Sequence, residues 1–262
     1  MINTAIQVKN LYLEISGKRI LHNISFNIQK GEFFSIIGPN GAGKTSLIKC
    51  ISRIMTGWTG LVHVNGVDLQ QHTQRQLAQQ ISYVPQAEGR NLPFTVFEFV
   101  LMGRYPHLSP FSTISAEDKA IATEMLDLTG LRHFKDRMLN TLSGGERQMA
   151  FIAAALAQGA EILLLDEPTS FLDYQHQAQV KALLSRLNVQ KNLTIVSISH
   201  DINAACEQSS RILAMKDGAS LFIEEPENML TSDTLQSLYQ TPFAITDHPV
   251  RDGKMAFIKE TT

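Results

Sequence analysis

The sequence predicts an α/β fold with a mainly parallel sheet, an antiparallel β layer near the N-terminus and an inserted helical subdomain. Residues 5–28 alternate between apolar and polar side chains, which is typical of half-buried strands. Residues 33–37 and 162–165 are short, nearly continuous apolar runs, which suit strands that a parallel sheet buries on both faces. The chain between about residues 87 and 160 instead shows helical patterns.

The apolar positions of the first segment follow a period of two and predict strands. They are Ile6, Val8, Ile24, Phe26 and Ile28. A later strand is predicted at residues 193–199, after a helix with apolar residues at i, i+3, i+4 and i+7. These residues are Val180, Leu183, Leu184 and Leu187. The order strand, helix, strand favours a βαβ unit and hence a parallel sheet. Residues 212–223, interrupted by Asp217 and Gly218, predict a hairpin.

The middle of the chain predicts at least one clearly bounded helix. Ile121, Met125 and Leu128 form one apolar stripe, which Ser115 can begin and Gly130 can end. We expect such helices to form an insertion between the early and the late strands of the sheet.

The length of 262 residues suits one large domain. We expect a single domain over residues 1–262, with a core of residues 1–86 and 161–262 and a helical subdomain of residues 87–160. Apolar residues make up 44% of the chain and charged residues 18%, which excludes a disordered protein. The 23 Lys and Arg against 25 Asp and Glu give no basic excess, so no nucleic-acid partner is expected.

Composition also predicts a reducing compartment. Cys50 and Cys206 are too few for a disulfide framework or a four-cysteine zinc site. No run of about 20 apolar residues predicts a membrane span. The first residues show no basic segment followed by an apolar run, so we expect no secretory signal.

The segment GPNGAGKT fits the phosphate-loop pattern Gly-x-x-x-x-Gly-Lys-Thr, between an apolar strand and a helical pattern. Its glycines let backbone N–H groups approach a phosphate. Lys44 supplies charge for the β- and γ-phosphates, and the Thr45 hydroxyl can bind Mg²⁺. The candidate nucleotide-binding residues are Gly38, Pro39, Asn40, Gly41, Ala42, Gly43, Lys44, Thr45 and Ser46. The pattern predicts a P-loop NTPase core.

Two carboxylates, Asp166 and Glu167, follow the buried run at 162–165. Ligands of a parallel sheet bind at the carboxyl ends of its strands. Asp166 can hold Mg²⁺ there, and Glu167 can orient or deprotonate a water molecule at the γ-phosphate.

A second candidate anion site begins at Ser143. Ser143 and Glu146 form a capping box at a helix start, and Gly144 and Gly145 leave its backbone N–H groups uncovered. At this point the order of GPNGAGKT, LSGGERQ and ILLLDEP resembles the nucleotide-binding subunits of ABC transporters, over nearly the whole chain.

The resemblance implies roles for further residues. Gln86 matches the Q-loop glutamine, which senses Mg²⁺ and the γ-phosphate, and Asp173 matches the aspartate of the D-loop, residues 170–173. His200 matches the switch histidine at the γ-phosphate. Ile15 stands about where the family stacks an aromatic residue on adenine, and Tyr12 is the nearest aromatic alternative.

The resemblance also implies a subclass. A single cassette without membrane spans fits an importer subunit, and the segment 99–107 with the tail around Thr241 and His248 is similar to ATPases of siderophore, haem and cobalamin importers. We expect uptake of an iron-siderophore or similar metal chelate. Haem or cobalamin import, and a soluble ATPase for iron–sulfur cluster assembly, are the alternatives.

The implied substrate and partners follow from the same family. We expect ATP and Mg²⁺, a homodimer closed by ATP bridging the phosphate loop of one copy and Ser143 of the other, and integral membrane permease subunits. A substrate-binding protein would act indirectly. Residues 87–107, with Phe94, Phe97 and Tyr105, are the candidate permease contact, on the cytoplasmic side of the inner (plasma) membrane.

Overall fold

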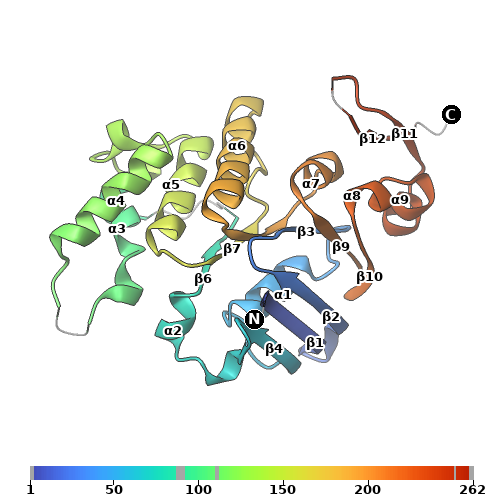
Figure 1. The fold of residues 1–262 in the computed structure, drawn as a ribbon, viewed down its shortest axis with the longest axis horizontal. Helices are drawn as coiled ribbons and strands as arrows, with labels where there is room; N and C mark the ends of the chain where they lie inside the picture. Colours follow the sequence, from blue (N-terminus) through green and yellow to red (C-terminus); the bar gives the residue numbers. More distant parts are fainter. Residues whose placement is uncertain (1–2, 87–91, 110–111, 251, 260–262) are drawn as a thin grey trace. The chain divides into compact units, whose positions relative to one another are not determined.

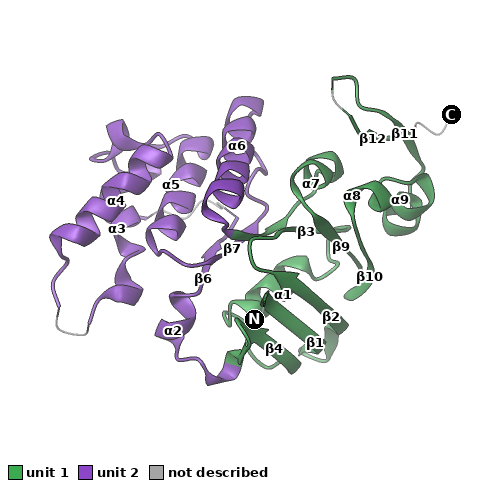
Figure 2. Ribbon diagram, in the orientation of Figure 1, with its two compact units in different colours: residues 1–69, 194–262 green, residues 70–193 purple. Residues whose placement is uncertain are grey.

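The computed structural model describes residues 3–86, 92–109, 112–250 and 252–259. It divides into two compact units, shown in green and purple in Figure 2. The first consists of residues 1–69 and 194–262, and the second of residues 70–193. The predicted division into a core and a subdomain of residues 87–160 stays a prediction.

An antiparallel sheet with the strand order β2-β1-β4-β5 belongs to the first unit. Its strands are β1 (Thr4–Ile15), β2 (Lys18–Gln29), β4 (Thr59–Val64) and β5 (Val67–Asp68). The predicted apolar positions are all buried, namely Ile6, Val8, Ile24, Phe26 and Ile28. The period of two therefore identified the inner face of this layer correctly.

Parallel strands form a second sheet in the same unit. β3 (Phe33–Ile37) pairs in parallel with β8 (Thr194–Ile198) and with β9 (Arg211–Lys216), and β10 (Ala219–Glu224) pairs with β9 in antiparallel register. Every residue of β3 and β8 is buried, as predicted for strands covered on both faces. Since β3 and β8 run in one direction, the loops after them leave the sheet at the same edge.

The predicted hairpin is formed by β9 and β10. Its two turn residues, Asp217 and Gly218, have φ values of 50° and 77°. Two left-handed positions in a two-residue turn match the twist of the flanking strands, which explains the Asp-Gly pair.

The remaining elements of the first unit are α1 (Lys44–Ile51), α7 (Ile202–Gln208), α8 (Pro226–Met229), α9 (Ser232–Tyr239), β11 (Phe243–Asp247) and β12 (Lys254–Ile258). Helix α7 packs on β3, and α8 and α9 pack on β9. The β11–β12 hairpin contacts α7 and α9 (Figure 1).

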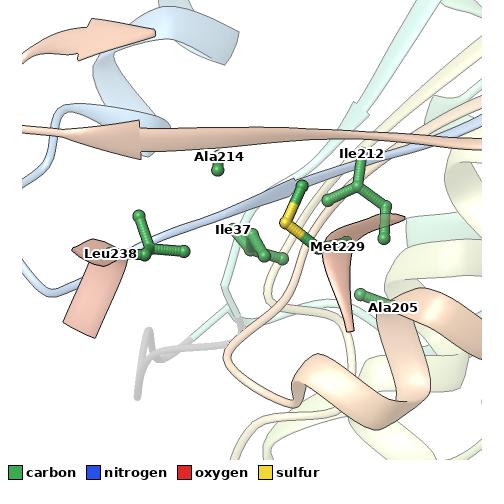
Figure 3. Packing of buried hydrophobic residues seen from close by; sticks show 6 residues of the cluster. All are labelled: Ile37, Ala205, Ile212, Ala214, Met229 and Leu238. Carbon is green, nitrogen blue, oxygen red and sulfur yellow. The ribbon is translucent and has the colours of Figure 1, made fainter. Parts of the chain in front are cut away.

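One apolar cluster connects these helices with the end of β3. Figure 3 shows its buried members Ile37, Ala205, Ile212, Ala214, Met229 and Leu238. Ile37 is the last residue of β3, immediately before Gly38. The C-terminal helices therefore support the strand from which the phosphate loop begins.

We expect Leu238→Ala to lower the free energy of unfolding by about 3 kcal/mol, because it leaves a cavity beside Ile37. Chemical denaturation measures the change. Gln236→Ala, on the exposed face of α9, is the matched control and should change stability by less than about 0.5 kcal/mol. Equal effects of both substitutions would contradict the assignment of Leu238 to the core.

The second unit contains two parallel strands and five α-helices among its described residues. The strands are β6 (Ile81–Val84) and β7 (Ile162–Asp166). The helices are α2 (Gln74–Ala78), α3 (Val96–Met102), α4 (Ala116–Leu128), α5 (Gly144–Ala157) and α6 (Tyr174–Lys191). Short 3-10 turns are η2 (Tyr105–His107), η3 (Arg132–Phe134) and η4 (Leu139–Thr141), and η1 (Leu69–Gln71) begins at the last residue of the first unit's N-terminal segment.

Helices α3, α4 and α5 pack against one another, so the middle of the chain is helical as predicted (Figure 1). The buried residues of α6 are the predicted Val180, Leu183, Leu184 and Leu187. The mainly parallel α/β fold with a separate antiparallel layer is thus confirmed. Within the described residues, no helix combines the length and apolarity needed to cross a bilayer.

The inner face of α4 differs from the predicted stripe. Ser115 begins the helix as predicted, but the buried residues are Asp118, Ala122 and Leu126. The predicted Ile121, Met125 and Leu128 lie half-buried on the flank. The physical reason is an ion pair: Asp118 turns inward to accept a hydrogen bond from Arg104 at 3.0 Å.

Asp118 predicts a pH dependence of stability. Hydrogen bonds from the Ser115 hydroxyl and backbone, together with Arg104, lower the pKa of Asp118 from 3.8 to about 2. Because the folded pKa is the lower one, the stabilisation exists above the unfolded pKa and is lost as pH falls toward about 2.

We therefore expect Asp118→Asn to destabilise the protein at neutral pH and to matter progressively less as pH falls from about 4 toward 2. Denaturation of both proteins across this range measures the difference. A difference that stays constant with pH would show that Asp118 is not held as an ionised carboxylate.

Candidate nucleotide-binding site

The phosphate loop, residues 38–45, continues directly from β3 into α1. The Lys44 side chain is buried, and its Nζ donates hydrogen bonds to the carbonyl oxygens of Gly38 and Pro39 at 2.8 and 3.0 Å. The loop thus folds around its lysine. A buried ammonium group beside the first N–H groups of a helix favours an anionic ligand.

The glycines of this loop serve different purposes. At Gly38, with φ of 144°, an added Cβ would lie 2.0 Å from the carbonyl oxygen of Met215. At Gly43, with φ of 91°, it would lie 2.8 Å from a side-chain carbon of Leu21. Nothing lies within 4 Å of an added Cβ at Gly41. Two glycines therefore allow close packing, whereas the third leaves the loop open to a ligand.

His200 lies at the same sheet edge as the phosphate loop. It is exposed and follows β8, and the preceding Ser199 donates its backbone N–H to the carbonyl oxygen of Ile36 at 3.1 Å. This bond ties the loop after β8 to the end of β3. Within the first unit, the structure therefore brings the predicted switch histidine to the edge where the phosphate loop begins.

The second unit brings the predicted acids together with the Q-loop glutamine. Asp166 is 5% exposed, and its Oδ2 accepts a hydrogen bond from Tyr83 Oη at 3.2 Å. Glu167 Oε2 accepts hydrogen bonds from Gln86 Nε2 at 3.0 Å and from Ser170 Oγ at 2.9 Å. These groups gather where the parallel strands β6 and β7 end.

Glu167 has a φ of 51°, a left-handed conformation that costs a non-glycine residue about 1 kcal/mol. Such strain persists where neighbouring contacts hold the residue, and here Gln86 and Ser170 hold its carboxylate.

Sequence reasoning assigned no supporting role to Tyr83 or Ser170. The available signal was position alone: Ser170 stands three residues after Glu167, and Tyr83 lies in the strand paired with β7.

The signature loop, residues 143–145, opens helix α5. Ser143 Oγ accepts the backbone N–H of Glu146 at 3.2 Å, and Glu146 Oε2 accepts the backbone N–H of Ser143 at 2.7 Å. The predicted capping box is thus confirmed. The backbone hydrogen bond from Ser143 is the main reason that the pKa of Glu146 lies below its usual range. An added Cβ at Gly144 meets no atom within 4 Å, so this helix start is open on one side.

Asp173 of the D-loop begins helix α6. Its Oδ1 accepts the backbone N–H of His176 at 2.8 Å, and its carboxylate also bonds the imidazole Nδ1 of the same residue. These bonds lower the pKa of Asp173. Phe171 and Tyr174 on either side are 92% and 90% exposed. Sequence reasoning missed His176, whose only signal was its place three residues after a capping aspartate.

The predicted adenine contact lies at a hairpin tip. Ile15 ends β1, is 42% exposed and pairs with Lys18 across the turn. Tyr12 is 37% exposed, and its ring meets His22 edge to face at 5.4 Å between centroids. Both side chains are open to a ligand, and the assignment of the adenine contact to Ile15 stays a prediction.

The donor chemistry fits Mg²⁺. The side chains of Thr45, Gln86 and Asp166 offer oxygen atoms, the ligands that this cation prefers, and Mg²⁺ is usually bound by few protein groups together with phosphates and water. In the described parts of the chain, no three His, Cys, Asp or Glu residues form a metal cage. Burial raises the pKa of the Cys50 and Cys206 thiols to about 12, which disfavours thiolate ligation.

Comparison with known proteins decides the family. The family model described as ABC transporter matches residues 21–170. This range begins within β2 and ends at the first residue of the D-loop, so it contains the phosphate loop, the signature loop and both acids. The chain belongs to the ABC transporter family. Members of this ATP-binding family hydrolyse ATP, and this ABC ATPase carries the phosphate loop, the signature loop and the acids in the family order.

Two curated relatives match nearly the whole ABC ATPase. The ferric enterobactin transport ATP-binding protein FepC of Escherichia coli is 38% identical over 88% of this chain and 85% of its own length. The iron(3+)-hydroxamate import ATP-binding protein FhuC of Bacillus subtilis is 36% identical over 94% of this chain and 91% of its own length.

Solved structures agree with this fold. An ABC transporter described as metal-chelate type, in an inward-facing conformation, matches 98% of both chains with a TM-score of 0.86 and 29% identity. A dimeric bacterial ABC transporter cassette matches 84% of this chain and 98% of its own, with a TM-score of 0.74 and 30% identity. The fold of this ABC ATPase is therefore that of solved ABC cassettes.

Proposed function

We propose that this ABC ATPase energises the uptake of an iron-siderophore or a similar metal chelate. The observation that carries the proposal is its similarity, over about nine-tenths of both chains, to import ATPases named for ferric enterobactin and iron(3+)-hydroxamate. The structural likeness to a metal-chelate type transporter supports the same class of cargo.

Two copies would form two composite nucleotide pockets. Each chain carries two separate anion-seeking helix starts, one at the phosphate loop and one at the signature loop. ATP bound to the phosphate loop of one copy would be covered by the signature loop of the other copy. The structural likeness to a dimeric cassette supports this arrangement. Binding of ATP would then close the dimer, and loss of the γ-phosphate would release it.

Within each pocket, each side chain would have a separate role in binding or hydrolysing ATP. Lys44, now bonded to two loop carbonyls, would turn to the β- and γ-phosphates. Glu167, held by Gln86, would accept a proton from the attacking water, and His200 would contact the γ-phosphate. Thr45, Gln86 and Asp166 would hold Mg²⁺, which neutralises phosphate charge when bound. Asp173, in the D-loop of the partner copy, would help to bind the nucleotide.

The membrane permease would contact residues 87–107. Residues 87–91 of this segment lie outside the described part of the chain. Phe94 and Phe97 are half-buried, whereas Tyr105 is 62% exposed. Arg75 Nε and Gln79 Nε2 both donate to the carbonyl oxygen of Pro106 at 2.8 Å and fix the turn that carries Tyr105. We place this peripheral subunit on the cytoplasmic side of the inner membrane, with a substrate-binding protein acting through the permease.

Transport assays in a strain that encodes this chain test the cargo. Deletion of the coding sequence should abolish uptake of a radio-iron-loaded catecholate or hydroxamate siderophore, and the wild-type chain, but not Glu167→Gln, should restore it. Radiolabelled haem and cobalamin are the parallel probes. If the deletion abolished haem or cobalamin uptake but left siderophore uptake intact, the cargo would be haem or cobalamin and the siderophore assignment would be wrong.

A pull-down from detergent-solubilised membranes tests the transporter class. We expect the tagged chain to recover a polytopic membrane protein. Recovery of soluble partners only, with siderophore uptake intact in the deletion strain, would contradict transport and favour an iron–sulfur cluster assembly factor.

A further inference from the structure

The imidazole ring of His176 leaves no room for a side chain at Gly145, the second glycine of the signature loop. An added Cβ at Gly145 would lie 2.2 Å from both Cδ2 and Cγ of His176, at the start of α6. At Gly144, an added Cβ meets nothing within 4 Å. The two adjacent glycines therefore differ: Gly144 faces open space, whereas Gly145 is in close contact with an imidazole ring.

The D-loop holds this ring in place. Nδ1 of His176 lies 2.8 and 2.9 Å from the two carboxylate oxygens of Asp173, and the backbone N–H of His176 donates to the same carboxylate at 2.8 Å. The His176 side chain is only 24% exposed although Asp173 is 64% exposed. The ring is thus fixed from the D-loop side by hydrogen bonds and from the signature side by contact with the backbone of Gly145.

We propose that His176 is a positioning residue that couples the D-loop to the signature loop within each subunit. Asp173 sets the orientation of the ring, and the ring sets the position of the helix start that Ser143 caps. The inference rests on the proposed function, in which the signature loop covers ATP bound to the partner copy. A displaced D-loop would then displace the signature loop and weaken closure of the dimer.

Substitutions at His176 test whether the ring acts on closure of the dimer and not on binding of ATP by a single chain. In the Glu167→Gln background, His176→Ala should leave the affinity of the monomer for a fluorescent ATP analogue within about twofold. It should raise the protein concentration needed for ATP-dependent dimerisation by about tenfold, because the two signature loops, released from the rings, would hold the closing position only about a tenth of the time. With Glu167 intact, the same substitution should lower kcat more than it changes KM.

A conservative substitution distinguishes positioning from general packing. His176→Asn keeps an amide near the position of Nδ1, so it can bond Asp173, and it should recover most of the dimerisation. Gln179→Ala, on the exposed face of the same helix, is the matched control and should behave like the parent protein.

A second-site test addresses the contact directly. Gly145→Ala should weaken dimerisation because its methyl group overlaps the ring. The double variant Gly145→Ala with His176→Ala should dimerise better than Gly145→Ala alone, because the ring has gone. A double variant no better than Gly145→Ala, or a His176→Ala protein with unchanged dimerisation, would overturn the inference. Absence of any ATP-dependent dimer in the parent Glu167→Gln protein would instead refute the proposed function.

Discussion

Replacement of Lys44 by alanine is expected to abolish steady-state ATP hydrolysis. Lys44 is the only charged residue of the phosphate loop, residues 38–45, and its buried ammonium group bonds the carbonyl oxygens of Gly38 and Pro39. Loss of one such charge-stabilising contact commonly costs about 3 kcal/mol or more in the transition state, which is at least about a hundredfold in rate. Release of inorganic phosphate from Mg-ATP by the purified variant measures the effect.

Lys49→Ala is the matched control for Lys44→Ala. Lys49 lies in the last turn of the same helix α1, away from the loop, so its loss should leave turnover near that of the wild type. Thermal unfolding of both variants checks that each is folded. Turnover at the wild-type rate in a folded Lys44→Ala protein would contradict the assignment of this lysine to the phosphates.

Replacement of Glu167 by glutamine is expected to separate binding from hydrolysis. The amide keeps the size of the side chain and can still contact Gln86 and Ser170, but it cannot accept a proton from water. General-base catalysis commonly contributes about a hundredfold to ten-thousandfold, so hydrolysis should fall by at least about a hundredfold. The variant should accumulate as an ATP-bound dimer, which light scattering with Mg-ATP detects.

Glu14→Gln, an exposed change of the same kind on β1, controls for the loss of a negative charge and should hydrolyse ATP like the wild type. If the Glu167→Gln protein remained monomeric at saturating Mg-ATP while still binding ATP, the proposed ATP-driven closure would be wrong. If it hydrolysed ATP at the wild-type rate, Glu167 would not be the general base.

Elements with an unambiguous apolar run or apolar period were predicted correctly from the sequence. Local residue spacing alone predicts the buried runs of β3 and β7 and the apolar stripe of α6. In the structure these same residues are buried. The capping boxes at Ser115 and Ser143 are equally local, since donor and acceptor lie three residues apart.

Features that depend on contacts distant in sequence could not be predicted in this way. The inner face of α4 is decided by Arg104, which draws Asp118 inward and overrides the apolar stripe. The support that Tyr83 gives Asp166 spans 83 residues of sequence, and the contact between His176 and Gly145 joins two different helices. No period or cap encodes such pairs, so they appear only once the fold has assembled them.

The most direct test of the composite pocket is the structure of the Glu167→Gln protein bound to Mg-ATP. We predict a dimer in which Ser143 and the signature-loop backbone of one copy lie within about 3 Å of the γ-phosphate held by Lys44 of the other copy. A structure in which each triphosphate is contacted by one chain only, with both signature loops facing solvent, would contradict it.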